Sequence, residues 1–171
     1  MRANAQIRLN KAQREAEGYL ELGLPQYALR TLARLGEPSS FGPVTLFLWG
    51  EALRAMDRYE EAIGPLKQAA ARDSENIHVW VALGWCYKRT GRLDQAIAAL
   101  ESALSADPSE ALLHYNLACY LTLARSKERA LVHLARALAI DANYRSLIDK
   151  ESDFDTLRND PDFQALTMIN V

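Results

Sequence analysis

The sequence contains few cysteines and no long apolar run. Its two cysteines, Cys86 and Cys119, lie far apart without C-x-x-C spacing, which excludes a disulfide framework and a zinc knuckle. No stretch reaches the roughly 18 apolar residues that a membrane span requires, and the first residues lack the apolar core of a signal peptide. We therefore expect a soluble protein of the reducing cytoplasm.

An excess of either charge is also missing. The 20 Lys and Arg residues nearly balance the 22 Asp and Glu residues, for a formal net charge of −2. This balance gives no global attraction for nucleic acid or for an anionic membrane, so neither is expected as a partner. The chain has no glycine-rich phosphate loop, nucleophile elbow or dinucleotide fingerprint. We expect neither an enzyme nor a cofactor.

The residues most often used in catalysis and metal binding show no functional spacing. His78, His114 and His133 match neither H-x-x-H nor H-E-x-x-H, and we interpret them as surface or packing residues. Cys86 and Cys119 lack a local nucleophile signature and are predicted to be small buried residues. No metal site is predicted.

What the sequence does contain is a period of 34 residues, which is a known helical-repeat length. Four classes of position share it: Ala16, Gly50, Gly84 and Ala118; Ala28, Ala62, Ala96 and Ala130; Leu32, Leu66, Leu100 and Leu134; and Tyr19, Leu53, Tyr87 and Leu121. Small residues at a fixed period favour the close crossing of two antiparallel helices, with large residues filling the space beside them.

Residues 77–110 show one unit of this period most clearly. Trp80, Leu83, Gly84 and Tyr87 follow the i, i+3, i+4, i+7 pattern of one helical face, and residues 93–106 continue with a second helix. Gly91 between them supplies a left-handed residue that ends the first helix. The run 107–110, Asp-Pro-Ser-Glu, predicts the start of the next helix, with Asp107 as the N-cap and Pro108 in the first position.

Residues 77–110 resemble the tetratricopeptide repeat. The residues that carry the resemblance are Trp80, Leu83, Gly84, Tyr87, Gly91, Ala96, Leu100, Ala103 and Pro108. Residues 43–76 and 111–144 resemble it more loosely, and residues 9–42 resemble it least. The resemblance implies an all-α, right-handed solenoid of four helix pairs in residues 1–143, followed by capping helices in residues 144–171. The ending is similar to those of bacterial members of the family.

Some features depart from the repeat pattern. Leu35-Gly36 is predicted to shorten the second helix of the first repeat, and Gly64-Pro65 to kink the second helix of the second repeat without breaking it. In the tail, a short helix is expected to about residue 151. The acidic pairs 153/155 and 160/162 lack the glycine and glutamate of a calcium loop, so they are predicted to cap helices.

The resemblance also implies a concave groove lined by the first helix of each pair. The expected lining is Gln13, Glu17 and Glu21; Phe47, Leu48, Glu51 and Arg54; Val81, Trp85, Lys88 and Arg89; and Tyr115, Asn116, Cys119 and Thr122. Only Asn116 fits the family's clamp for a C-terminal carboxylate, which disfavours that mode of binding.

The apolar members of this lining suggest how the groove binds. Phe47, Val81, Trp85 and Tyr115 are predicted to be anchors for a partner segment that carries acidic flanks toward Lys88. The alternative is that these aromatic residues pack against neighbouring helices. We expect a scaffold that binds a protein or peptide. A dedicated assembly or secretion chaperone, a self-assembling homo-oligomer and a regulatory subunit of an enzyme are the alternatives.

Overall fold

The computed structural model describes the backbone of residues 2–168 and the side chains of residues 4–168. Within this range the chain is helical and has no strand. The helices of the repeats are α1 (Arg2–Glu21), α2 (Pro25–Ala33), α3 (Pro43–Ala55), α4 (Tyr59–Arg72), α5 (Ile77–Arg89), α6 (Leu93–Ala106), α7 (Ala111–Leu123) and α8 (Lys127–Ile140). The tail contains η2 (Ala142–Tyr144), α9 (Arg145–Ile148), η3 (Ser152–Leu157) and α10 (Pro161–Thr167), and a 3-10 turn, η1 (Pro38–Ser40), precedes α3.

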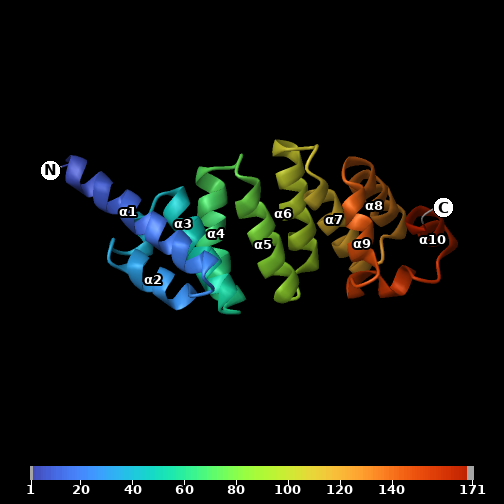
Figure 1. Cartoon of the computed structure of the whole chain (residues 1–171), viewed down its shortest axis with the longest axis horizontal. Coiled ribbons are helices and arrows are strands. Elements are labelled where there is room, and N and C mark those ends of the chain that lie inside the picture. The colour runs from blue at the N-terminus through green and yellow to red at the C-terminus, as the bar shows by residue number, and fades with distance from the viewer. Residues whose placement is uncertain (1, 169–171) are drawn as a thin grey trace.

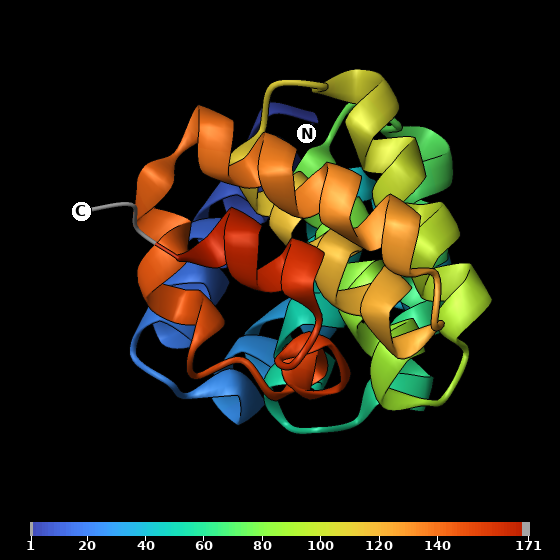
Figure 2. The same cartoon turned by 90° about the vertical axis from the view of Figure 1, so that its right-hand side faces the viewer.

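The eight repeat helices form four antiparallel pairs that stack along one axis (Figure 1). The tail folds back onto the last pair, where α10 packs against α8 and η3 against α7 (Figure 2). This arrangement confirms the predicted all-α solenoid of four helix pairs with a helical cap. No helix in residues 2–168 is both long enough and apolar enough to cross a lipid bilayer.

The turn inside each helix pair has the same backbone geometry. Its central residue adopts positive φ at Gly23 (69°), Asp57 (59°), Gly91 (76°) and Arg125 (58°), which are spaced by the repeat period. The next amide donates back to a carbonyl in the last turn of the first helix, as Arg92 N does to Tyr87 O at 2.8 Å. This is the hydrogen bonding of a Schellman-type helix end. The prediction for Gly91 is therefore confirmed.

The two helices of a pair cross at the predicted small residues. In the second pair, a Cβ atom built on Gly50 would lie 2.5 Å from Leu66 Cγ, which is far inside van der Waals contact. In the third pair, a Cβ on Gly84 would lie 3.4 Å from Leu100 Cγ. The leucines are fully buried, so the absent side chain is what allows the helices to approach.

The start of α7 differs from the prediction. Asp107 ends α6, and its carboxylate accepts hydrogen bonds from Ser109 N and Oγ in the connecting turn. The helix begins only at Ala111, and its N-cap is Glu110, whose carboxylate accepts from Leu112 N. The assignment of Asp107 and Pro108 to the start of the helix was wrong, because these residues span the gap between helix pairs.

Proline and glycine act elsewhere much as their chemistry suggests. Pro65 lies inside α4, which nevertheless continues from Tyr59 to Arg72 without a break. Pro25 occupies the first turn of α2, where a backbone N–H has no partner within the helix, so its absence in proline loses no hydrogen bond. Helix α2 ends early, as predicted, and Gly36 follows it with φ of 125°.

The tail also differs in part from the prediction. The short helix α9 ends at Ile148, before the predicted residue 151. Asp160 caps α10 as predicted, accepting from Asp162 N and Phe163 N. Asp153 caps nothing, however: η3 is capped by Glu151, which accepts from the amide of Asp153. The Asp153 side chain instead points toward the repeats, where it meets Lys88 of α5.

Candidate protein-interaction groove

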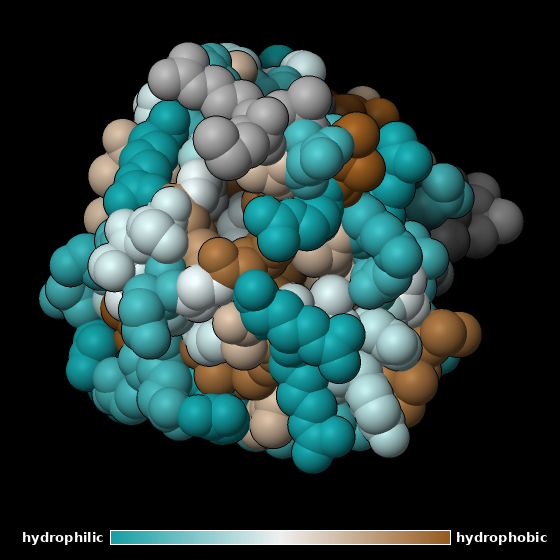
Figure 3. Space-filling model, turned by 90° about the vertical axis from the view of Figure 1, so that its left-hand side faces the viewer, coloured by the Kyte–Doolittle hydropathy of each residue, from teal (hydrophilic) through white to brown (hydrophobic). Residues whose placement is uncertain are grey.

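The predicted groove residues belong to helices α1, α3, α5 and α7. Seen from the N-terminal end, the surface is hollowed near its centre, where apolar atoms lie among hydrophilic ones (Figure 3). The structure gives the individual residues quite different surroundings. Three groups can be distinguished: an apolar strip, a set of paired charges and a set of residues covered by the tail.

The apolar strip consists of Phe47, Val81 and Trp85. Phe47 on α3 and Val81 on α5 occupy equivalent positions one period apart, and both are half-buried against the main core. Trp85 follows Val81 by one helical turn, and 39% of its surface is exposed. Trp85 is therefore the groove aromatic that the fold leaves open to a ligand.

The charged residues beside the strip are largely paired within the chain. Arg54 forms two hydrogen bonds with the carboxylate of Glu51, at 2.7 and 2.8 Å, and this contact raises the pKa of Arg54. The guanidinium of exposed Arg89 lies 5.2 Å from the centre of the Tyr59 ring. Arg54 is thus held in an ion pair within the chain, whereas the charge of Arg89 faces solvent beside the Tyr59 ring.

Lys88 lies where the groove meets the tail. Its ammonium group is 5.5 Å from the centre of the Trp85 ring and 5.3 Å from that of Tyr120, and it forms an ion pair with Asp153. Because 19% of the Lys88 side chain and 11% of the Asp153 side chain are exposed, the pair is mostly shielded from water. The expectation that a partner's acidic flank meets Lys88 is therefore corrected: the chain supplies that acid itself.

The predicted groove residues of α7 are covered. Tyr115, Cys119 and Thr122 are buried, because residues 151–157 lie on this part of the helix. The ring of fully buried Phe154 meets that of Tyr115 edge-on, with centroids 5.8 Å apart. Tyr115 and Cys119 are therefore not open to a partner as groove lining, since the tail occupies the groove there. The burial of Cys119 agrees with its interpretation as a small buried residue. Leu48 is also buried, on α3, and Asn116 is half-buried.

The two thiols are buried, and two of the three histidines lie together. Burial raises the pKa of Cys86 to about 12 and that of Cys119 even further, so both thiols are protonated at neutral pH. His114 and His133 unexpectedly meet, with their Nδ1 atoms 2.9 Å apart, and His114 Nε2 lies 3.1 Å from Pro108 O. Burial, followed by the charge of His114, lowers the pKa of His133.

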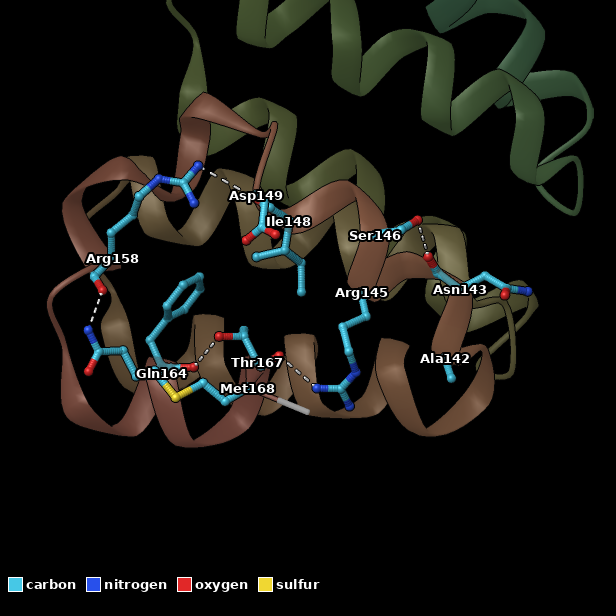
Figure 4. A pocket seen from close by; sticks show the side chains of 11 residues that line it. Ala142, Asn143, Arg145, Ser146, Ile148, Asp149, Arg158, Gln164, Thr167 and Met168 are labelled. Atoms are coloured by element: carbon cyan, nitrogen blue, oxygen red, sulfur yellow. Dashed lines mark hydrogen bonds between the residues drawn. The ribbon is translucent and has the colours of Figure 1, made fainter. Parts of the chain in front are cut away.

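A hollow of about 830 Å³ lies between α9 and α10, outside the groove (Figure 4). Its two arginines are bound to backbone carbonyls: Arg145 donates to Leu166 and Thr167, and Arg158 donates to Ile148 and Glu151. These bonds join the tail segments to one another. The arginines therefore stabilise the cap, because their N–H donors are used within the tail.

Comparison with known proteins agrees with this architecture. The family model for the tetratricopeptide repeat matches residues 53–118. A crystal structure of MamA aligns with a TM-score of 0.71 at 20% identity, covering 80% of each chain. YrrB, described as a TPR protein with an unusual peptide-binding site, aligns at 0.70 and 19% identity over 79% of this chain and 70% of its own.

A third solved structure is TTC0263, a thermophilic TPR protein of Thermus thermophilus. It aligns at 0.70 and 19% identity, over 92% of this chain and 87% of its own. No curated protein matches the sequence. Residues 53–118 therefore match the tetratricopeptide repeat, and the described chain has the fold of tetratricopeptide-repeat proteins.

Proposed function

We propose that the chain is a protein–protein interaction module that holds a segment of a partner in the groove formed by α1, α3 and α5. The observation that carries this proposal is the exposure of Trp85 beside the half-buried Phe47 and Val81. A large aromatic residue open to solvent in a concave surface is the kind of anchor in which binding energy concentrates. YrrB, whose description names a peptide-binding site, supports the same use of the fold.

The groove also limits what the partner segment contains. An apolar side chain of the segment would cover Trp85 and Val81 and remove both from water. At the N-terminal end, Glu17 and Glu21 are exposed on α1 and make the surface negative. Because Lys88 is already paired with Asp153, the open part of the groove favours a segment with basic rather than acidic flanks.

This proposal assigns binding rather than catalysis to the chain. Both thiols are held in their protonated form, which makes them poor nucleophiles. The two free cysteines are consistent with a reducing cytoplasm. A bacterial source is supported by similar structures from Thermus thermophilus and Desulfovibrio magneticus.

The test compares two exposed aromatic residues. Trp85→Ala removes the proposed anchor, whereas Tyr27→Ala removes a ring of similar exposure, 43%, on α2 outside the groove. A photo-crosslinking amino acid at position 47 would attach the bound segment for identification by mass spectrometry. We expect the wild type and Tyr27→Ala to crosslink the same partner, and Trp85→Ala to lose at least about tenfold in yield with its helicity unchanged.

The outcomes separate the alternative functions. Equal crosslinking by Trp85→Ala would refute the groove as the binding site. A single client that becomes insoluble without this chain would identify a dedicated chaperone. Crosslinks from one copy of the chain to another, with light scattering that depends on concentration, would identify a self-assembling protein.

A further inference from the structure

Three potential metal ligands meet where the tail lies on the groove. Cys119 belongs to α7, and Glu151 and Asp153 belong to the start of η3. The sulfur and one carboxylate oxygen from each acid all lie within 4.8 Å of one another. The sequence did not suggest this cluster, because Cys119 is more than 30 residues away from the two acids and the acids lie outside the repeats.

The cluster carries excess negative charge in a partly buried place. Asp153 is only 9% exposed, and Cys119 is buried. Lys88 pairs with Oδ2 of Asp153 and can balance one of the two carboxylates. The second carboxylate, that of Glu151, accepts only a backbone amide hydrogen bond among the described residues, from Asp153 N. Two carboxylates held close together with one ammonium group leave a net negative charge, so the site favours an additional positive charge.

An unpaired polar group lies at the same place. Tyr115 precedes Cys119 by one helical turn and is 5% exposed, and its hydroxyl makes no hydrogen bond with any residue in the described part of the chain. The Tyr115 ring packs edge-on against Phe154, the residue after Asp153, which brings it next to the segment that carries the two acids. A buried hydroxyl without a partner is uncommon in native proteins and points to a group that the protein alone does not supply.

We propose that Cys119, Glu151 and Asp153 bind a divalent zinc ion, with a water molecule in the fourth position that accepts a hydrogen bond from Tyr115. Zinc accepts thiolate and carboxylate ligands in one tetrahedral site, whereas magnesium and calcium take oxygen ligands. On binding, the Cys119 thiol releases its proton to solvent. The thiolate, the two carboxylates, the Lys88 ammonium and the ion then sum to zero charge.

The position of the site gives the ion a structural role. It would join α7 to η3 and so fix the tail over the C-terminal end of the groove. Lys88, which contacts both Asp153 and Trp85, links this junction to the open strip. By fixing the tail, the ion would define the C-terminal limit of the groove that is open to the partner segment.

Cobalt(II) provides a direct test, because a thiolate bound to it gives a sulfur-to-metal charge-transfer absorption. The full-length chain would be stripped with a chelator and titrated with Co²⁺, and then Zn²⁺ would be added to displace the cobalt. We expect one equivalent of Co²⁺ to produce the band in the wild type and in Cys86→Ser. Cys119→Ser should lose the band, and Glu151→Gln should bind at least about tenfold more weakly.

Circular dichroism would establish that each variant is folded. Since Glu151 is partly exposed, Glu151→Gln tests the site even if a change at buried Cys119 disturbs folding. The proposal is overturned if the wild type gives no charge-transfer band, if the band persists in folded Cys119→Ser, or if Glu151→Gln binds Co²⁺ as tightly as the wild type. This test uses no protein partner, so its result is independent of the proposed groove function.

Discussion

Gly50 lies where α3 crosses α4, and its replacement by alanine tests the packing of the solenoid. A Cβ at this position would lie 2.5 Å from Cγ and 2.6 Å from Cδ2 of Leu66. Leu66 is fully buried and cannot move aside without disturbing its neighbours. Overpacking of this kind costs about 1–3 kcal/mol, while alanine in place of a helical glycine gains about 0.5–1 kcal/mol.

Gly18 on α1 provides the matched control. It is also a helical glycine, but a Cβ built on it would meet nothing within 4 Å. Gly18→Ala should therefore show only the stabilisation that alanine brings to a helix. Gly50→Ala should have a lower free energy of unfolding than Gly18→Ala, by the overpacking cost of about 1–3 kcal/mol. For a chain of this length each kcal/mol corresponds to about 2–4 °C in melting temperature.

Urea denaturation followed by far-UV circular dichroism would measure the difference. In a Leu66→Ala background the atoms that Cβ meets are gone, so Gly50→Ala should lose its penalty, and the double-mutant cycle should show coupling. Gly84→Leu should destabilise by at least about 1–3 kcal/mol, because its Cβ position is already 3.4 Å from Leu100 Cγ. If Gly50→Ala proves as stable as Gly18→Ala, the crossing is looser than described and the reasoning fails.

Two further predictions concern the histidine pair and the proline within α4. The free energy of unfolding should fall as the pH drops below about 6.5, the ordinary pKa of histidine. Burial lowers the pKa of His133 in the folded protein, so His133 binds a proton more readily in the unfolded chain than in the folded one. Urea titrations at several pH values should show that the free energy of unfolding depends less on pH in His133→Gln than in the wild type. His78→Gln is the control, because His78 lies outside the histidine pair, and it should keep the wild-type pH dependence. An unchanged pH dependence in His133→Gln would contradict the assignment to His133. Pro65→Ala should raise the free energy of unfolding by about 1–2 kcal/mol, since it restores an amide inside the helix. Pro25→Ala should raise the free energy of unfolding by less, because Pro25 lies in the first turn of α2. Equal effects of the two substitutions in the same titration would contradict a cost of Pro65 inside α4.

The sequence by itself determined the repeating part of the structure. The recurrence of Gly50, Gly84 and their equivalents predicted the helix crossings, because only small side chains permit such close approach. It also predicted the helix end at Gly91 and the cap at Asp160, since these depend on the chemistry of one or a few adjacent residues. It placed Trp85 correctly on the first helix of its pair, although exposure could not be read from the period alone.

The tertiary structure decided which groove residues stay open. Tyr115 and Cys119 occupy groove positions by their period, yet the tail covers them. Lys88 and Asp153 are 65 residues apart in the sequence. They form an ion pair only because the tail folds back onto the repeats. The tail lies outside the period, so no repeating pattern indicates where it folds back. Its position follows from burial of Phe154 and Phe163 against the last repeat, which depends on the shape of the assembled helices.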